Sequence, residues 1–296
     1  MIERFNFYDI YGYLLPGSAL VAILWLPFAI GSGSLPVEKL SAAVIALGFA
    51  YIVGHVLQTV ATNVIPLNVE DAKKQMRAPS DVMLDPSDTN LNEKVKERLA
   101  ARVLKEFAID LEIASSGTGT DDISKRREDA FYQCRTFLIL KKATVYTEQY
   151  EGLYALMRGL CSAFCIGGSY LVGWGASRWH AGPIENVVTL LFWLSALGIA
   201  ILAPWSMSLD PYDRKRKDID RYLSASILVL ALVSGWLLGH ARAPLSPWIT
   251  WGCAAAALFA VTRCYSSYRV YTVLFARSVW RDFAGFSIPG EAASKA

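Results

Sequence analysis

Long apolar runs constrain this 296-residue chain more than any other feature of its sequence. Most of the runs are roughly 18–25 residues long, enough to cross ~30 Å of hydrocarbon as a helix. None of the six predicted spans contains Asp or Glu. The runs predict an all-α, polytopic membrane helix bundle with six spans. These spans are 16–30, 40–62, 154–176, 187–207, 222–240 and 246–264.

The N-terminus does not read as a cleaved signal sequence. Glu3 and Asp9 interrupt the basic region that a secretory signal would need, and no small-x-small cleavage site follows the first apolar run. Residues 2–15 are aromatic and mildly amphipathic, which suits a segment lying on the membrane surface. Pro16-Gly17 marks either a bend or the first turn of the span.

A polar insert separates the second and third spans, and we expect it to form a cytosolic helical hairpin. Its start, with Pro66, Pro79 and Pro86, looks irregular. Asn90 and Glu93 then form a capping box for an amphipathic helix over 90–114. No Pro or Gly occurs between Asp122 and Glu151, so we expect a single helix to run from the insert into the third span. Its predicted packing seam is Tyr132, Thr136, Ile139, Ala143, Tyr146, Tyr150, Leu153, Met157 and Leu160.

The resulting organisation has four parts: 1–65 with an amphipathic N-terminus and two spans, the 66–152 hairpin, 153–265 with four spans, and 266–296 with a C-terminal helix and tail. We expect the last span to continue as a helix to Phe283. Its Arg263, Arg269, Arg277 and Arg281 fall opposite Tyr265, Tyr268, Phe275, Val279 and Phe283. That pattern suits a helix at the membrane interface or one packed on the hairpin.

Basic residues are distributed unequally between the loops. The loops on one side of the membrane contain most of them: Arg4, fourteen Lys/Arg in 66–153, five in 208–221 and the C-terminal arginines. The loops on the other side contain only Lys39, Arg178 and Arg242. We expect the protein to lie in the cytoplasmic (inner) membrane. The positive-inside rule then places both termini in the cytosol. The five cysteines lie in spans or on the cytosolic side, so we expect no disulfide framework.

Few residues in the spans are suited to catalysis. The sequence predicts no catalytic, cofactor or metal site and no enzyme, because no motif or cluster of His, Cys and carboxylates has the required spacing. We expect Arg158, near the cytosolic end of its span, to extend to the interface. The insert carries sixteen acidic against fourteen basic residues, so we expect no nucleic-acid partner.

The second span contains a stripe of small residues followed by polar ones. Ala42, Ala46, Ala50 and Gly54 recur every four residues, and Gln58 and Thr62 continue the stripe. His55, Thr59 and Asn63 flank it toward the cytosol. Small residues allow close helix packing and polar ones hydrogen-bond across it, which favours a contact between helices. The alternative is a polar pore lining in which His55 titrates.

Residues 7–17, Phe-Tyr-Asp-Ile-Tyr-Gly-Tyr-Leu-Leu-Pro-Gly, resemble the start of uncharacterised bacterial multi-pass membrane proteins, some of which are encoded near phage-defence genes. The resemblance defines no active site. It implies a bacterial membrane protein with a part in phage defence.

Three hypotheses for function follow. The first is a non-enzymatic, channel-like or membrane-perturbing effector, in the lipid bilayer and as a homo-oligomer, controlled by its cytosolic helical layer. The second is a carrier for a neutral or apolar solute, which would tolerate spans without carboxylates. The third is a membrane scaffold whose insert recruits a soluble cytosolic protein.

Overall fold

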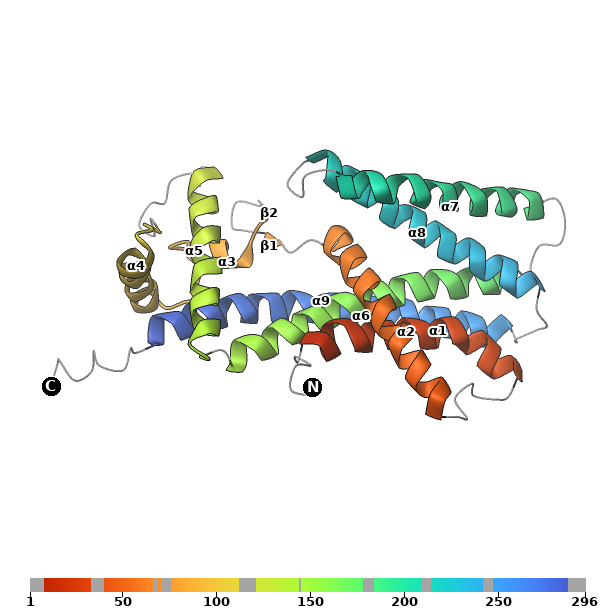
Figure 1. Cartoon of the computed structure of the whole chain (residues 1–296), viewed down its shortest axis with the longest axis horizontal. Helices are drawn as coiled ribbons and strands as arrows, with labels where there is room; N and C mark the ends of the chain where they lie inside the picture. The colour runs from red at the N-terminus through yellow and green to blue at the C-terminus, as the bar shows by residue number, and fades with distance from the viewer. Residues whose placement is uncertain are drawn as a thin grey trace. The chain divides into compact units, whose positions relative to one another are not determined.

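The computed structural model describes residues 8–32, 40–65, 69–70, 76–111, 121–143, 145–177, 184–208, 214–241 and 247–286. This part of the chain is helical apart from one short antiparallel ladder, in which β1 (Val69–Glu70) pairs with β2 (Met76–Arg77) (Figure 1). The predicted surface segment before Tyr8 and the C-terminal tail after Pro289 lie outside the described residues.

Each predicted span overlaps one of the long helices. A π-helical stretch, η2 (Asp9–Leu14), leads directly into the first of them, so Pro16-Gly17 lies in a first turn and not at a bend. The long apolar helices are α1 (Leu15–Ser32), α2 (Leu40–Val64), α6 (Val145–Ala176), α7 (Ile184–Ser208), α8 (Arg214–Ala241) and α9 (Pro247–Gly285).

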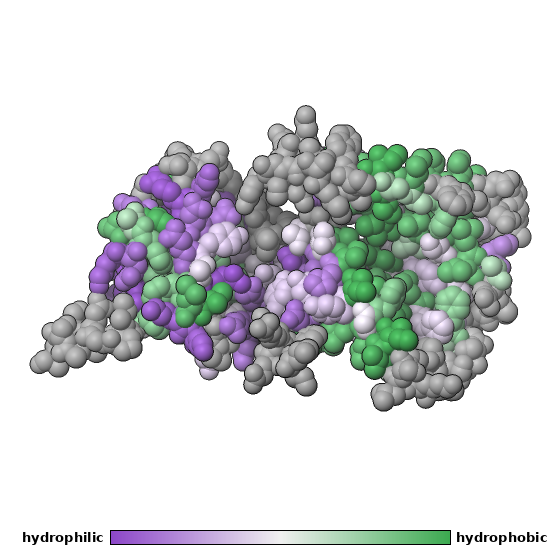
Figure 2. Space-filling view, viewed as in Figure 1, coloured by the Kyte–Doolittle hydropathy of each residue, from purple (hydrophilic) through white to green (hydrophobic). Residues whose placement is uncertain are grey.

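Four helical segments in the described residues are long and apolar enough to cross a bilayer, against six spans predicted. They are Asp9–Ile30, Ala43–Thr62, Tyr146–Ala176 and Asp218–Ala241. Helix α7 contributes a shorter apolar stretch, Leu190–Leu202. Figure 2 shows the hydrophobic residues gathered over α7 and α8 and the hydrophilic residues over α4 and α5. The chain therefore has the composition and helix lengths of a multi-pass membrane protein.

The chain divides into two compact units. Residues 1–66 and 155–268 form one, which we call the apolar unit, and residues 67–154 and 269–296 form the other, which we call the polar unit. Helices α6 and α9 contribute residues to both. The predicted loop from Asp210 to Arg221 is shorter than expected, because α8 already begins at Arg214.

The expected continuous helix from Asp122 to Ala176 is wrong. Helix α5 (Asp121–Leu140) ends at Leu140, and α6 begins as a separate helix at Val145. Lys142 adopts a left-handed conformation with φ 54°, and the Ala143 and Lys142 amides donate to the carbonyls of Leu138 and Ile139. This is the hydrogen-bond pattern of a Schellman cap, with lysine where glycine is usual. Arg135 of α5 also donates to Glu151 of α6 across the corner, at 2.6 Å.

The predicted packing seam of α5 lies on its outer face. Tyr132, Thr136 and Ile139 are exposed. The buried stripe is one position away, and its members enter a common core: Ala130, Phe131, Cys134 and Leu138. Both stripes repeat at three- and four-residue intervals, so the periodicity alone does not identify the inner face.

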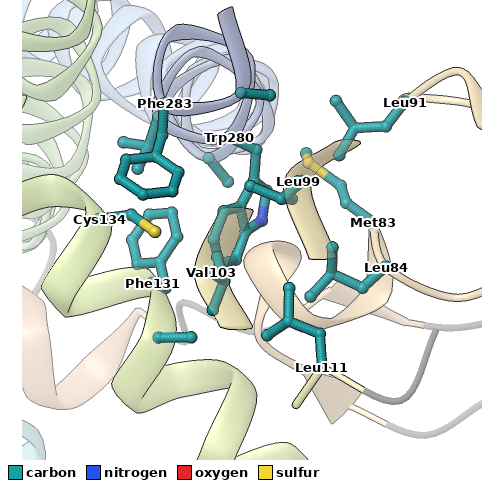
Figure 3. Close-up of a cluster of buried hydrophobic side chains, with 14 of the residues drawn as sticks. Met83, Leu84, Leu91, Leu99, Val103, Leu111, Phe131, Cys134, Trp280 and Phe283 are labelled. Carbon is teal, nitrogen blue, oxygen red and sulfur yellow. The ribbon is translucent and has the colours of Figure 1, made fainter. Parts of the chain in front are cut away.

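The core of the polar unit forms around Trp280 and Phe283 of α9, which are fully buried (Figure 3). Leu99 and Val103 reach it from α4 (Glu93–Phe107), and the Trp280 indole Nε1 donates to the Ser80 carbonyl at the start of α3 (Pro79–Val82), at 3.0 Å. The C-terminal part of α9 therefore packs on the insert, which was one of the two predicted alternatives. The insert by itself does not complete this core.

Helix α4 is shorter than the predicted 90–114 helix and is capped by a different residue. The side chain of Asn92 accepts a hydrogen bond from the Lys94 amide, whereas Asn90 bonds to Asp88. The proposed Asn90–Glu93 capping box is therefore wrong, and the cap begins two residues later.

Close glycine contacts hold the helices of the apolar unit together. A Cβ on Gly17 of α1 would lie 1.8 Å from the Ala50 carbonyl oxygen of α2, and one on Gly54 would lie 1.9 Å from that of Tyr13. Gly173 of α6 and Gly235 of α8 contact each other's helix in the same way. Residues without side chains let the backbones approach closely, as the small-residue stripe predicted.

Candidate functional site: buried polar contacts in each unit

Gln58 joins three elements of the apolar unit through its buried side-chain amide. Its Nε2 donates to the Gly12 carbonyl of η2 at 2.6 Å and to the Ala155 carbonyl of α6 at 2.7 Å. Its Oε1 accepts from Arg158 Nε and Nη2, at 3.2 and 3.0 Å. We call this set of contacts the Gln58 junction.

The sequence around Gln58 explains its reach. Ala50, Gly54, Leu57 and Ala61 form the buried face of α2. On α6, a Cβ on Gly159 would lie 2.8 Å from Gln58 Nε2. Glycine at this position therefore leaves the space that the amide occupies. Small residues on both helices bring the backbones within range of one side chain.

The expectation that Arg158 extends to the interface is wrong. Only 6% of this residue is exposed. The acceptor that Gln58 supplies contributes to this burial, because hydrogen bonds to a charged group are worth about 1.5–3 kcal/mol. No sequence rule for arginine near a helix end anticipates an acceptor that lies 100 residues earlier.

The other candidate residues of the second span lie elsewhere. His55, Thr59 and Thr62 are exposed. His55 stacks on the Tyr13 ring with centroids 3.7 Å apart, while the two threonine hydroxyls donate to carbonyls four residues earlier in α2. The structure thus brings the Gln58 side chain together with Arg158, whereas the Thr62 hydroxyl contacts only the Gln58 backbone carbonyl. A pore lining formed by these residues stays a prediction.

The Gln58 junction is suited to joining helices. An amide carries no titrating proton, and its donor and acceptor atoms are all engaged here. Buried polar groups whose partners are removed cost about 1–3 kcal/mol each, so any displacement of α6 relative to α2 is opposed at this point. The arrangement therefore holds α6 in one position relative to α2.

The polar unit contains a second buried polar cluster, which the sequence analysis missed. Asp81 Oδ1 lies 2.7 Å from Arg77 Nη2 and 3.0 Å from Arg127 Nη1. Asp85 contacts the same two guanidinium groups, at 2.7 and 3.0 Å. We call these four residues the ionic cluster. The four-residue spacing of Arg77, Asp81 and Asp85 could have predicted ion pairs between them. It was overlooked because the prolines of this segment suggested an irregular structure.

Hydrogen bonding controls the charge of Asp81. Burial would raise the pKa of its carboxyl group, but bonds from Arg77, Ser124 and Arg127 outweigh burial and lower the pKa below 3.8. Lys96 is also buried beside the cluster and donates to the carbonyls of Asp85 and Asp88. Burial lowers the pKa of Lys96 against the opposing effect of nearby carboxylates.

Among the residues that the structure describes, no group of three or more His, Cys, Asp or Glu side chains is placed to hold a metal ion. No family model, curated protein or solved structure matches this chain.

Replacing Gln58 with leucine is expected to destabilise the apolar unit by about 2–4 kcal/mol, because two donated bonds and an acceptor of Arg158 are lost. The measurement is unfolding of the detergent-solubilised full chain by SDS titration. Thr62→Val is the control, since its exposed hydroxyl bonds only within α2. Equal stability of the two variants would show that the junction does not hold the helices.

Replacing Asp81 with asparagine is expected to cost about 3–5 kcal/mol at pH 7, because Arg127 then keeps its buried charge with one carboxylate fewer. The folded-state pKa of Asp81 lies below the unfolded value, so ionised Asp81 stabilises the fold above that value. This contribution is lost as pH falls through the folded pKa, and the difference between wild type and variant must shrink there.

Urea titrations of the full chain at several pH values, followed by tryptophan fluorescence, measure this difference. Asp129→Asn is the control, since Asp129 is an exposed aspartate on α5. A pH-independent difference between wild type and Asp81→Asn would contradict the assignment.

Proposed function

We propose that this protein is a non-enzymatic, channel-like or membrane-perturbing effector of a bacterial cytoplasmic membrane. In this proposal six helices span the bilayer, both termini are cytosolic, and the polar unit forms a cytosolic layer that controls the membrane helices. Four apolar helical segments of spanning length support the membrane location. The apolar stretch of α7 and the N-terminal half of α9 would supply the remaining two spans.

The continuity of α6 and α9 carries the proposal. Each is one unbroken helix with residues in both units. In α6, the first residues that belong to the apolar unit include Ala155 and Arg158, which are the two that Gln58 contacts. A change in the polar unit that moved α6 along or around its axis would act first on the Gln58 junction. This is the place where a signal in one layer would alter helix packing in the other.

The exposed apolar side chains of α2 and α7 support an assembly within lipid. Ile45 is 73% exposed and Phe49 58% exposed, and large apolar residues of α7 such as Leu194 are similarly uncovered. Surfaces of this kind are covered by acyl chains or by neighbouring membrane helices. We propose that bilayer lipid and further copies of this chain share them. The resemblance of residues 7–17 to bacterial membrane proteins near phage-defence genes suggests phage defence as the biological setting.

Expression of the full chain in bacteria is expected to depolarise the cells, which a voltage-sensitive dye measures. Gln58→Leu is expected to change the depolarisation, because the junction on α6 is lost, and Thr62→Val is the matched control in α2. Membrane-inserted protein is quantified in parallel. Unchanged potential with wild-type protein in the membrane, and a monomer in detergent, would contradict the effector function.

Topology is tested separately by single-cysteine labelling in a cysteine-free background. A cysteine in 287–296 or in 209–213 is expected to resist a membrane-impermeant maleimide in intact cells and to react after lysis. A cysteine in 178–183 is expected to react in intact cells. The reverse pattern would overturn the orientation that the basic loops predict.

A membrane scaffold is the second candidate. The polar unit has its own hydrophobic core and ionic cluster, so it supplies a folded surface for a soluble partner. A stable protein complex without any change in membrane potential would favour the scaffold over the effector.

A further inference from the structure

The polar unit contains a pocket of about 270 Å³ between the start of α3 and helices α5, α6 and α9. Its buried lining residues include the apolar Phe131, Phe275 and Ala276 and the polar Ser80 and Thr272. The Tyr154 and Phe275 ring centroids are 5.3 Å apart, so aromatic surface continues from the floor to the α6 wall. The pocket lies entirely within the residues of the polar unit.

Negatively charged groups outnumber positively charged groups in the lining of the pocket. Arg135 Nη2 donates to both oxygens of Glu151, at 2.6 and 2.8 Å, so this guanidinium and this carboxylate compensate each other. Glu128, about two turns before Arg135 on α5, is exposed at the rim beside Tyr132. The lining therefore carries one surplus negative charge beside aromatic rings.

These features select a ligand class. An ammonium group gains from the faces of aromatic rings and from a nearby carboxylate, whereas an anion would meet Glu128 and find Arg135 already bonded. Ligand pockets for drug-sized molecules have volumes of about 300–1,000 Å³, so this one suits a smaller molecule. The apolar floor would take a ring or short hydrocarbon group, and the rim would take the charge.

We propose that this pocket binds a small organic ammonium ion whose apolar part packs on Phe131 and Phe275 and whose charge lies between Tyr132 and Glu128. The site stands on the pocket geometry alone and does not require the effector function proposed above.

Binding of phenylethylammonium to the full chain in lipid nanodiscs tests the site by isothermal titration calorimetry, with empty nanodiscs subtracted. We expect a dissociation constant below about 10 mM and weaker binding of neutral 2-phenylethanol and anionic phenylacetate. Glu128→Gln and Tyr132→Leu are each expected to weaken binding of the cation by about two- to fivefold, the loss of one exposed charge or cation–π contact.

Glu97→Gln removes an exposed glutamate on α4 away from the pocket and is expected to leave binding unchanged. Circular dichroism of each variant confirms that it is folded. Three results would each overturn the proposal: equal binding of all three probes, equal binding of the cation by wild type and Glu128→Gln, or no protein-dependent heat with the cation.

Discussion

A polar side chain among membrane helices has no water to bond, and the Gln58 junction satisfies that constraint entirely with protein groups. One amide donates to carbonyls of η2 and α6 and accepts from Arg158. The glycine contacts between α1 and α2 follow from the same requirement, because a side chain as short as glutamine reaches two neighbours only when the backbones are close. Packing and hydrogen bonding are thus parts of one arrangement.

Each of the two units buries a guanidinium group. Arg127 in the polar unit contacts two carboxylates, which neutralise its charge, and this pairing ties α5 to the segment that contains α3. Arg158 in the apolar unit donates to the side-chain amide oxygen of Gln58, which orients the guanidinium. Ionisable groups among apolar helices are costly, and they are concentrated at functional positions of membrane proteins.

The helix positions in the apolar unit were predictable because long apolar runs have few alternatives in a bilayer. The corner after α5 was not, because Lys142 takes a backbone conformation that usually signals itself by glycine. Gln58 was identified as a contact between helices, but its partner Arg158 was expected at the interface, since no local pattern reveals a contact 100 residues away. The small-residue stripe of α2 did not predict which residues after Gln58 are buried. Four residues exceed one 3.6-residue turn, so a stripe with that spacing drifts around the helix, and Thr62 is exposed.

The place of Trp280 in the chain has a consequence for biosynthesis. Its bond to Ser80 closes a separation of 200 residues, and every apolar helix from α6 onward is synthesised in between. At ribosomal speeds of roughly 5–20 residues per second, that interval is about 10–40 s. Leu99 and Val103 emerge long before the tryptophan that covers them. The polar unit must therefore complete its folding after translation of the membrane helices, during a period in which its apolar side chains are open to chaperones and proteases.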